Sequence, residues 1–140
     1  MSIVQPHLVD GRVLDLFAGS GALGLEALSR GAATADFVEN APASLRAIAA
    51  NIAALGAENA ARVHRTDALR FIETLGDDAY DIAFADPPYR QGLAERVATR
   101  WLERPFSRML GVEHERKEAM PEGGDTRRYG DTAITIYRHE

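Results

Sequence analysis

A short apolar run that enters a glycine-rich turn constrains the fold of this chain more than any other feature. Arg12 to Phe17 (RVLDLF) has the composition of a buried strand, and G-S-G-A-L-G follows at 19–24. Helix-forming residues continue to Arg30 and end before Gly31. In this order the glycines let the backbone approach a ligand closely, beside the positive end of the helix dipole. The same spacing also makes a plain turn, so other residues must decide between the two.

The remainder of the chain alternates strands with helices. Further strands are predicted at 34–39, 62–65, 80–85 and 109–113, helices at 42–55, from Asp67 and at 93–101, and a closing hairpin across 127–129 and 132–137. This order predicts one α/β domain over residues 1–140, with a mostly parallel, doubly wound sheet and a C-terminal antiparallel hairpin. We expect Trp101 on the apolar stripe of the last helix to be a core residue.

Composition removes several classes of protein. The chain has 140 residues, a net charge of -5, 46% hydrophobic residues and no cysteine. This content argues against disorder and excludes disulfides, thiolate zinc sites and a cysteine nucleophile. No apolar run approaches the ~18 residues of a membrane span, and the N-terminus lacks a signal-peptide pattern. The four histidines have no ligand spacing. We expect a cytoplasmic monomer without a metal or a membrane contact.

Two acidic residues fit a nucleoside ligand at the glycine turn. Glu39 ends the second predicted strand, 20 residues past Gly19, where a carboxylate can accept both ribose hydroxyls of an adenosine. Asp15 lies inside the first strand, where an acid can hold an ammonium group such as that of S-adenosylmethionine (SAM). A nicotinamide enzyme usually has an apolar residue there, so Asp15 disfavours that alternative. The simpler readings are a solvated Glu39 and a buried Asp15 bonded to nearby backbone.

Two further segments follow the third and fourth strands. Asp67 can accept a hydrogen from an adenine amino group or simply cap a helix. Asp86-Pro87-Pro88-Tyr89 suits an exocyclic amine such as guanine N2, because the Asp86 carboxylate and the Pro87 carbonyl can accept both N–H groups and orient the nitrogen lone pair. The prolines stiffen the loop, and Tyr89 can stack on a base that has left its helix. The alternative is a proline turn that ends a strand.

These segments resemble the RsmD family, the bacterial 16S rRNA (guanine-N2) methyltransferases. The resemblance runs from about Gly11 to Tyr137 and is most specific in D-L-F-A-G-S-G-A-L-G-L-E-A-L-S-R-G-A at 15–32, with support from D-P-P-Y at 86–89 and R-R-Y-G-D-T at 127–132. It implies a Rossmann-like SAM-dependent methyltransferase fold, SAM as methyl donor, and 16S rRNA or the assembling small ribosomal subunit as partner.

The resemblance also implies site residues. The expected cofactor-binding residues are Asp15, Phe17, Ala18, Gly19, Gly21, Glu39, Asn40, Asp67 and Ala68, with the glycine turn at the methionine part of SAM and Asp67 and Ala68 at the adenine edge. The expected catalytic residues are Asp86, Pro87, Pro88 and Tyr89. The expected RNA contacts are Tyr89 and Arg90.

The chain departs from the family pattern in two places. Family members begin with a basic stretch and a helix, of which Met1 to Val9 resembles only the tail, so our hypothesis is that Met1 is internal to a longer reading frame. The segment 101–112 is short, which predicts a trimmed fifth strand. Other readings remain open: an amine methyltransferase for DNA adenine or a protein glutamine, or a non-catalytic module. The arginines at 96, 100 and 104 can meet phosphates but better fit a solvated helix face.

Overall fold

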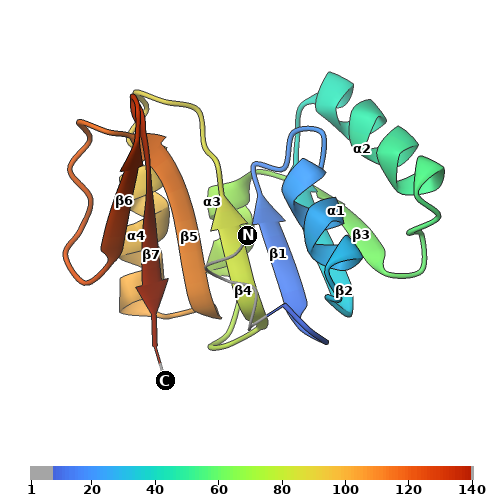
Figure 1. Cartoon of the computed structure of the whole chain (residues 1–140), viewed down its shortest axis with the longest axis horizontal. Helices are drawn as coiled ribbons and strands as arrows, with labels where there is room; N and C mark the ends of the chain where they lie inside the picture. Colours follow the sequence, from blue (N-terminus) through green and yellow to red (C-terminus); the bar gives the residue numbers. More distant parts are fainter. Residues whose placement is uncertain (1–7, 140) are drawn as a thin grey trace.

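The computed structural model describes residues 8–139, and these form a seven-stranded sheet with helices on both faces (Figure 1). The strands are β1 (Arg12–Leu16), β2 (Thr34–Glu39), β3 (Ala61–Arg65), β4 (Tyr80–Ala85), β5 (Ser107–Glu115), β6 (Asp125–Tyr129) and β7 (Thr132–Arg138). The helices are α1 (Ala22–Ser29), α2 (Pro42–Ala54), α3 (Ala68–Glu73) and α4 (Leu93–Glu103).

The strand order is β3-β2-β1-β4-β5-β7-β6. The first five strands in this order are parallel to their neighbours, while β7 runs antiparallel to both β5 and β6. The predicted fold class is therefore confirmed: a doubly wound, mostly parallel sheet with an antiparallel hairpin at one edge. Figure 1 shows that hairpin, in dark red, at the edge opposite β3.

Apolar side chains divide between the two faces of the sheet. On one face, Leu25 of α1 and Ile48 of α2 pack with Phe37 and Ile82 of the strands. On the other, residues of α3 and α4 pack against the alternate strand positions, and Trp101 is buried there. Its indole nitrogen donates to the Ser107 carbonyl at 3.0 Å, so Trp101 is a core residue as predicted. The central strands β1, β4 and β5 are thus covered on both sides, which is the arrangement that parallel sheets require, while the edge strands β3 and β6 are largely exposed.

The close approach of α1 to the sheet depends on one glycine. A Cβ added at Gly24 would lie 2.3 Å from Cε1 of Phe37, so any larger residue at 24 would push α1 off β2. Gly19 and Gly21 have positive φ angles of 58° and 82°, which the tight turn into α1 requires. The three glycines of the G-x-G-x-x-G pattern therefore serve two purposes: turn geometry at the first two and helix packing at the third.

The fifth strand corrects one expectation. β5 runs from Ser107 to Glu115, so it is not trimmed. It extends beyond the predicted 109–113 because β7 pairs with it from Met109 to Glu115 and supplies partners for its polar end. His114 is buried there, with Nε2 bonded to Thr135 Oγ1 at 2.7 Å. The family-like helix tail expected at Met1 to Val9 falls almost wholly outside the described residues.

Candidate functional site

The site residues expected from the sequence gather along one edge of the sheet, where the parallel strands end. Register pairs Leu16 with Val38 and Ala85, and Glu39 with Arg65. The segments that follow these strands therefore lie side by side in the order 66–68, 39–41, 17–19 and 86–89. Ligands of open α/β sheets bind at this edge, near the point where the strand order reverses.

Glu39 holds the glycine turn against the end of β2. One oxygen of its carboxylate accepts from the Gly19 amide at 2.8 Å. The other accepts from the amides of Asn40 at 3.1 Å and Ala41 at 2.9 Å. A carboxylate has about four acceptor positions, so three backbone bonds leave capacity for a ligand hydroxyl. Glu39 is therefore not merely a solvated strand end, because it connects two of the loops that form the site.

The turn itself is strained and open. Phe17 has a φ of 58°, an unfavourable value for a residue with a side chain, and such strain is concentrated at functional sites. The Ala18 amide donates to the Val38 carbonyl at 3.1 Å, which fixes the turn to β2. A Cβ added at Gly19 would have no neighbouring atom within 4 Å. The space above this glycine is free for a ligand.

Asp15 is buried directly beneath this turn. Its side chain accepts a hydrogen bond from the Gly24 amide at 3.0 Å, and only 2% of the residue is exposed. Burial raises the pKa of Asp15 to about 7; the bond from Gly24 opposes the rise, and the charges of Asp86 and Glu39 add to it. The backbone contact weighed for Asp15 is therefore present. The electrostatic coupling also places the three acidic groups near one another.

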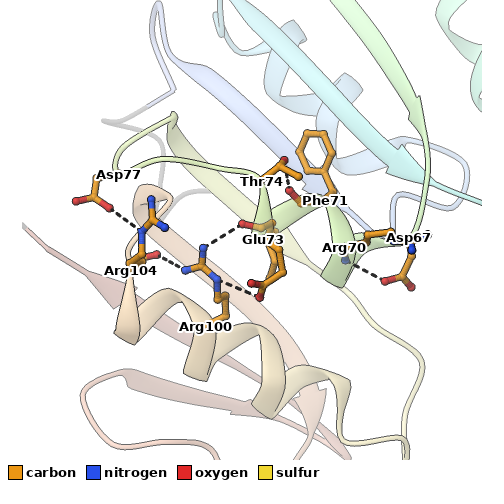
Figure 2. Close-up of polar contacts among 9 residues, drawn as sticks. Asp67, Arg70, Phe71, Glu73, Thr74, Asp77, Arg100 and Arg104 are labelled. Atoms are coloured by element: carbon orange, nitrogen blue, oxygen red, sulfur yellow. Dashed lines mark hydrogen bonds and ion pairs between the residues drawn. The ribbon is translucent and has the colours of Figure 1, made fainter.

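Asp67 and Ala68 lie at the start of α3. Asp67 is the N-cap of this helix, since its carboxylate accepts from the Arg70 amide at 3.0 Å (Figure 2). Ala68 is buried under it. Asp67 is exposed, and capping occupies one of its two oxygens. The capping role is confirmed, and the second oxygen is available for a ligand.

The D-P-P-Y segment leaves β4 beside the glycine turn. Asp86 is exposed and Pro87 is buried, so the segment is anchored in its middle while the carboxylate stays open to a ligand. Tyr89 is 38% exposed, and its hydroxyl lies 3.2 Å from Thr132 Oγ1 at the start of β7. The tyrosine thus spans from the end of β4 to the hairpin at the edge of the sheet.

Glu113 is a site residue that the sequence reasoning did not identify. Register aligns Ala85 with Val112, so Glu113 of β5 lies beside Asp86, the residue that follows β4. Burial, a hydrogen bond to Asp86 and the repulsion between the two carboxyls together raise the pKa of Glu113 to about 7. Glu113 is therefore partly protonated near neutral pH, where its carboxyl group can donate to Asp86. The sequence signal that could have identified Glu113 is its position as an acidic residue at the end of the predicted strand 109–113.

Three arginines after the D-P-P-Y segment form ion pairs within the protein. Arg100 is nearly buried and bonds to Glu73 at 3.2 Å and to the Ile72 carbonyl at 3.3 Å, so it joins α4 to α3 (Figure 2). Arg104 lies 3.7 Å from Asp77. Arg90 has a φ of 65° and pairs with Glu115 at 3.4 Å, away from the glycine turn. Arg100 therefore stabilises the α3–α4 contact, and the expectation of a solvated helix face is wrong at this position.

Within residues 8–139, no three His, Cys, Asp or Glu side chains gather where they could hold a metal ion. None of the helices that the structure describes has the length and apolar character needed to cross a bilayer.

The sequence matches a family model described as Conserved hypothetical protein 95 over residues 1–138. Ribosomal RNA small subunit methyltransferase D of Escherichia coli (strain K12) is 49% identical over 94 residues, which cover 67% of this chain and 46% of that protein. The matched part is therefore about half the length of this curated relative. YlbH of Bacillus subtilis (strain 168) is 34% identical over 148 residues, covering 98% of this chain and 80% of YlbH.

Solved structures share the fold. The yhhF protein of Escherichia coli superposes with a TM-score of 0.84 at 36% identity, over 99% of this chain and 81% of that one. An RNA methyltransferase of Salinibacter ruber, solved with S-adenosyl-L-homocysteine, superposes with a TM-score of 0.72 at 12% identity, over 98% of this chain and 87% of that one. At that identity the second likeness concerns the fold alone.

Proposed function

The chain belongs to the family described as Conserved hypothetical protein 95, and from this premise we propose that it transfers a methyl group from SAM to the exocyclic N2 amine of a guanine in small-subunit (16S) rRNA. The observation that carries the proposal is the position of the D-P-P-Y segment directly beside the glycine turn, through the pairing of Leu16 with Ala85. A relative named for small-subunit rRNA methylation supports the choice of substrate.

The residues at the strand ends fit SAM. The open backbone at Gly19 accommodates the methionine part, and the remaining acceptor capacity of Glu39 suits the ribose hydroxyls. Asp67 and Ala68 flank the adenine edge. When bound, SAM supplies an electrophilic methyl group on a sulfonium. The carboxylates of Glu39 and Asp86 create a negative potential that favours such a cationic ligand, and Asp15 adds to it in its ionised form.

Asp15 changes its proton occupancy when the cofactor binds. With a pKa of about 7, it holds a proton in a large fraction of the free protein at neutral pH. A positive ammonium group beside it favours the ionised form, so the proton is released on binding. The Gly24 amide continues to hold the carboxylate in place through this change.

Asp86 and Pro87 orient the acceptor amine. The lone pair of a guanine N2 amine is delocalised into the ring, so the nitrogen is a weak nucleophile. The Asp86 carboxylate and the Pro87 carbonyl accept the two N–H bonds, aim the lone pair toward the cofactor side and stabilise positive charge as it develops on nitrogen. Tyr89 stacks on the base after it has left its helix.

Glu113 keeps Asp86 in this orientation. In its protonated form, Glu113 donates a hydrogen bond to one oxygen of Asp86 and leaves the other oxygen for the substrate. It acts on the substrate through Asp86, so it is a positioning residue. After methyl transfer the nitrogen proton becomes acidic, and Asp86 is the nearest group of the proposed site that can accept it.

Calorimetric titration with SAM and S-adenosylhomocysteine, followed by methyl transfer to 16S rRNA and to small ribosomal subunits, tests the proposal. We expect micromolar cofactor binding and incorporation of methyl groups at guanine N2, located by mass spectrometry of nucleosides. Methylation of DNA adenine or of a protein glutamine would instead favour the second candidate acceptor, which the D-P-P-Y chemistry also allows. A folded chain that binds neither compound would overturn the proposal.

A further inference from the structure

A cleft of about 660 Å³ opens on the side of Tyr89 that faces the hairpin. Besides Tyr89 its lining includes four basic side chains, namely Arg90, Arg116, Lys117 and Arg128. They come from the D-P-P-Y loop, the segment after β5 and strand β6, so the cleft exists only in the folded protein. Its volume lies within the ~300–1,000 Å³ of ligand-binding clefts.

The charge of the cleft is opposite to that of the protein. Four basic residues face two acidic ones, Glu115 and Asp131, which leaves a net charge of +2 in a chain of -5. Glu115 forms an ion pair with Arg90 at 3.4 Å, and the Glu115 side chain is only 16% exposed. Lys117 is the only lysine of the sequence. Positive charge is therefore concentrated where the proposed substrate would arrive.

Most of this positive charge is not neutralised by the protein. Among the described residues, Arg116, Lys117 and Arg128 form no ion pair with a carboxylate, and the Arg116 guanidinium donates to the Gly130 carbonyl at 3.3 Å. Arg127, the neighbour of Arg128, instead lies 3.8 Å from Asp125. The three unpaired cations are thus able to bind an anion from outside.

Tyr89 connects the cleft to the methyl-transfer site. The same side chain closes the D-P-P-Y segment and lines the cleft, and its hydroxyl is held by Thr132 at 3.2 Å. Glu113 lies two residues before Glu115 on β5, so the Asp86–Glu113 pair and the cleft are neighbours along that strand. An aromatic face next to a basic groove is the combination that binds single-stranded nucleic acid, by base stacking and phosphate contacts.

We propose that this cleft binds the phosphodiester backbone of the RNA strand next to the target guanine, a proposal that rests on the proposed function. The cations contact phosphates and position the strand, while base identity is read at the D-P-P-Y segment. Glu115 fixes Arg90 at the entrance. The cleft gives an acidic protein a local surface for RNA without making the whole chain basic.

The test measures binding of a short fluorescein-labelled single-stranded RNA by the full chain, using fluorescence anisotropy over a range of salt concentrations. The cleft variant combines Arg116→Ala, Lys117→Ala and Arg128→Ala. The matched control removes the same charge at the opposite end of the sheet, where the exposed arginines at the starts of β3 and β5 and the end of β7 lie: Arg62→Ala, Arg108→Ala and Arg138→Ala. Loss of three phosphate contacts reduces the steepness of log K against log salt by about 2.

We expect RNA affinity to fall at least tenfold further in the cleft variant than in the control. Asp131→Asn provides an independent arm, because removing an exposed negative charge from the cleft should tighten RNA binding, which misfolding cannot do. Equal losses in the cleft and control variants, or no effect of Asp131→Asn, would overturn the proposal. Binding of an acidic peptide in place of RNA would overturn it too and assign the cleft to a protein partner.

Titration with S-adenosylhomocysteine in the absence of RNA separates this proposal from the proposed function. If the chain binds S-adenosylhomocysteine but shows no cleft-dependent RNA binding, the methyltransferase proposal stands and the cleft proposal is overturned. If the chain binds RNA through the cleft but does not bind S-adenosylhomocysteine, the cleft proposal stands and the methyltransferase proposal is overturned.

Discussion

Glu113 of β5 lies beside Asp86, the residue that follows β4, and a hydrogen bond to the Asp86 side chain contributes to the raised pKa of Glu113. Burial and this contact raise the pKa of Glu113 to about 7. Glu113 is therefore partly protonated near neutral pH and loses its proton as the pH rises. Because Asp86 begins the D-P-P-Y segment, the protonation of Glu113 affects the proposed acceptor site directly.

The first prediction concerns the rate of methyl transfer. Above pH 7, Glu113 ionises, its hydrogen bond to Asp86 is replaced by repulsion, and kcat should fall. Glu113→Ala should lower kcat at pH 7 by about tenfold, equivalent to ~1.4 kcal/mol, with little change in the KM for SAM. Glu113→Gln keeps a donor for Asp86, so it should retain most of the rate and show no fall above pH 7.

The control for this series is Glu103→Gln, an exposed change on α4 outside both proposed sites, which should keep the wild-type pH profile. A fall in kcat above pH 7 that persists in Glu113→Gln would show that another group causes it.

The second prediction concerns the pH dependence of stability. The pKa of Asp15 rises from 3.8 in the unfolded chain to about 7 in the folded protein, so the folded state holds a proton that the unfolded state releases. The resulting stabilisation is complete below about pH 4 and is lost as the pH rises through 7. Asp15→Asn keeps an acceptor for Gly24 but cannot ionise. Its free energy of unfolding should therefore decline less between pH 5 and pH 8 than that of the wild type.

Urea unfolding at both pH values measures this difference. Asp131→Asn, at an exposed site, should leave the wild-type dependence unchanged. The attribution to Asp15 fails if Asp15→Asn and wild type lose the same stability over this interval.

The third prediction concerns cofactor binding. Glu39→Ala removes the acceptor of the Gly19, Asn40 and Ala41 amides and the proposed ribose contact. Hydrogen bonds to charged groups contribute about 1.5–3 kcal/mol, so affinity for S-adenosylhomocysteine should fall roughly 10–100-fold. Glu39→Gln retains one acceptor oxygen, so its affinity for S-adenosylhomocysteine should lie between those of the wild type and Glu39→Ala. Glu58→Ala, an exposed change on the loop after α2, should bind as the wild type does in calorimetry. Unchanged affinity in Glu39→Ala would remove this residue from the site.

The fourth prediction concerns the packing of α1. In Gly24→Ala, the new methyl group would lie 2.3 Å from the Phe37 ring, and overpacking of this kind costs about 1–3 kcal/mol. That cost exceeds the helix-propensity gain of ~1 kcal/mol, so the thermal midpoint should fall. Adding Phe37→Leu should recover part of the loss. Gly76→Ala, where a Cβ meets no atom within 4 Å, is the matched control, and an equal effect of the two alanines would contradict the packing argument.

The sequence by itself determined the alternation of elements and the positions of the strand ends. Apolar periodicity and glycine turns are local signals, so β1, β2 and β4 and the capping of α3 by Asp67 were predicted almost to the residue. Because parallel strands end at one edge of a sheet, Glu39 and Asp86 could be placed beside Gly19 before the fold was known. Their roles in methyl transfer remain predictions.

Only the tertiary structure decided the length of β5, the partner of Asp86 and the location of the basic cleft. His114 and Glu115 carry no local strand signal, and they extend β5 because β7, far along the chain, supplies their hydrogen bonds. The raised pKa of Glu113 depends on burial and on a neighbour 27 positions away in the sequence. Lys117 and Arg128 meet Tyr89 only after the hairpin has folded onto the sheet. Such long-range contacts depend on the packing of whole elements, which residue spacing along the chain does not encode.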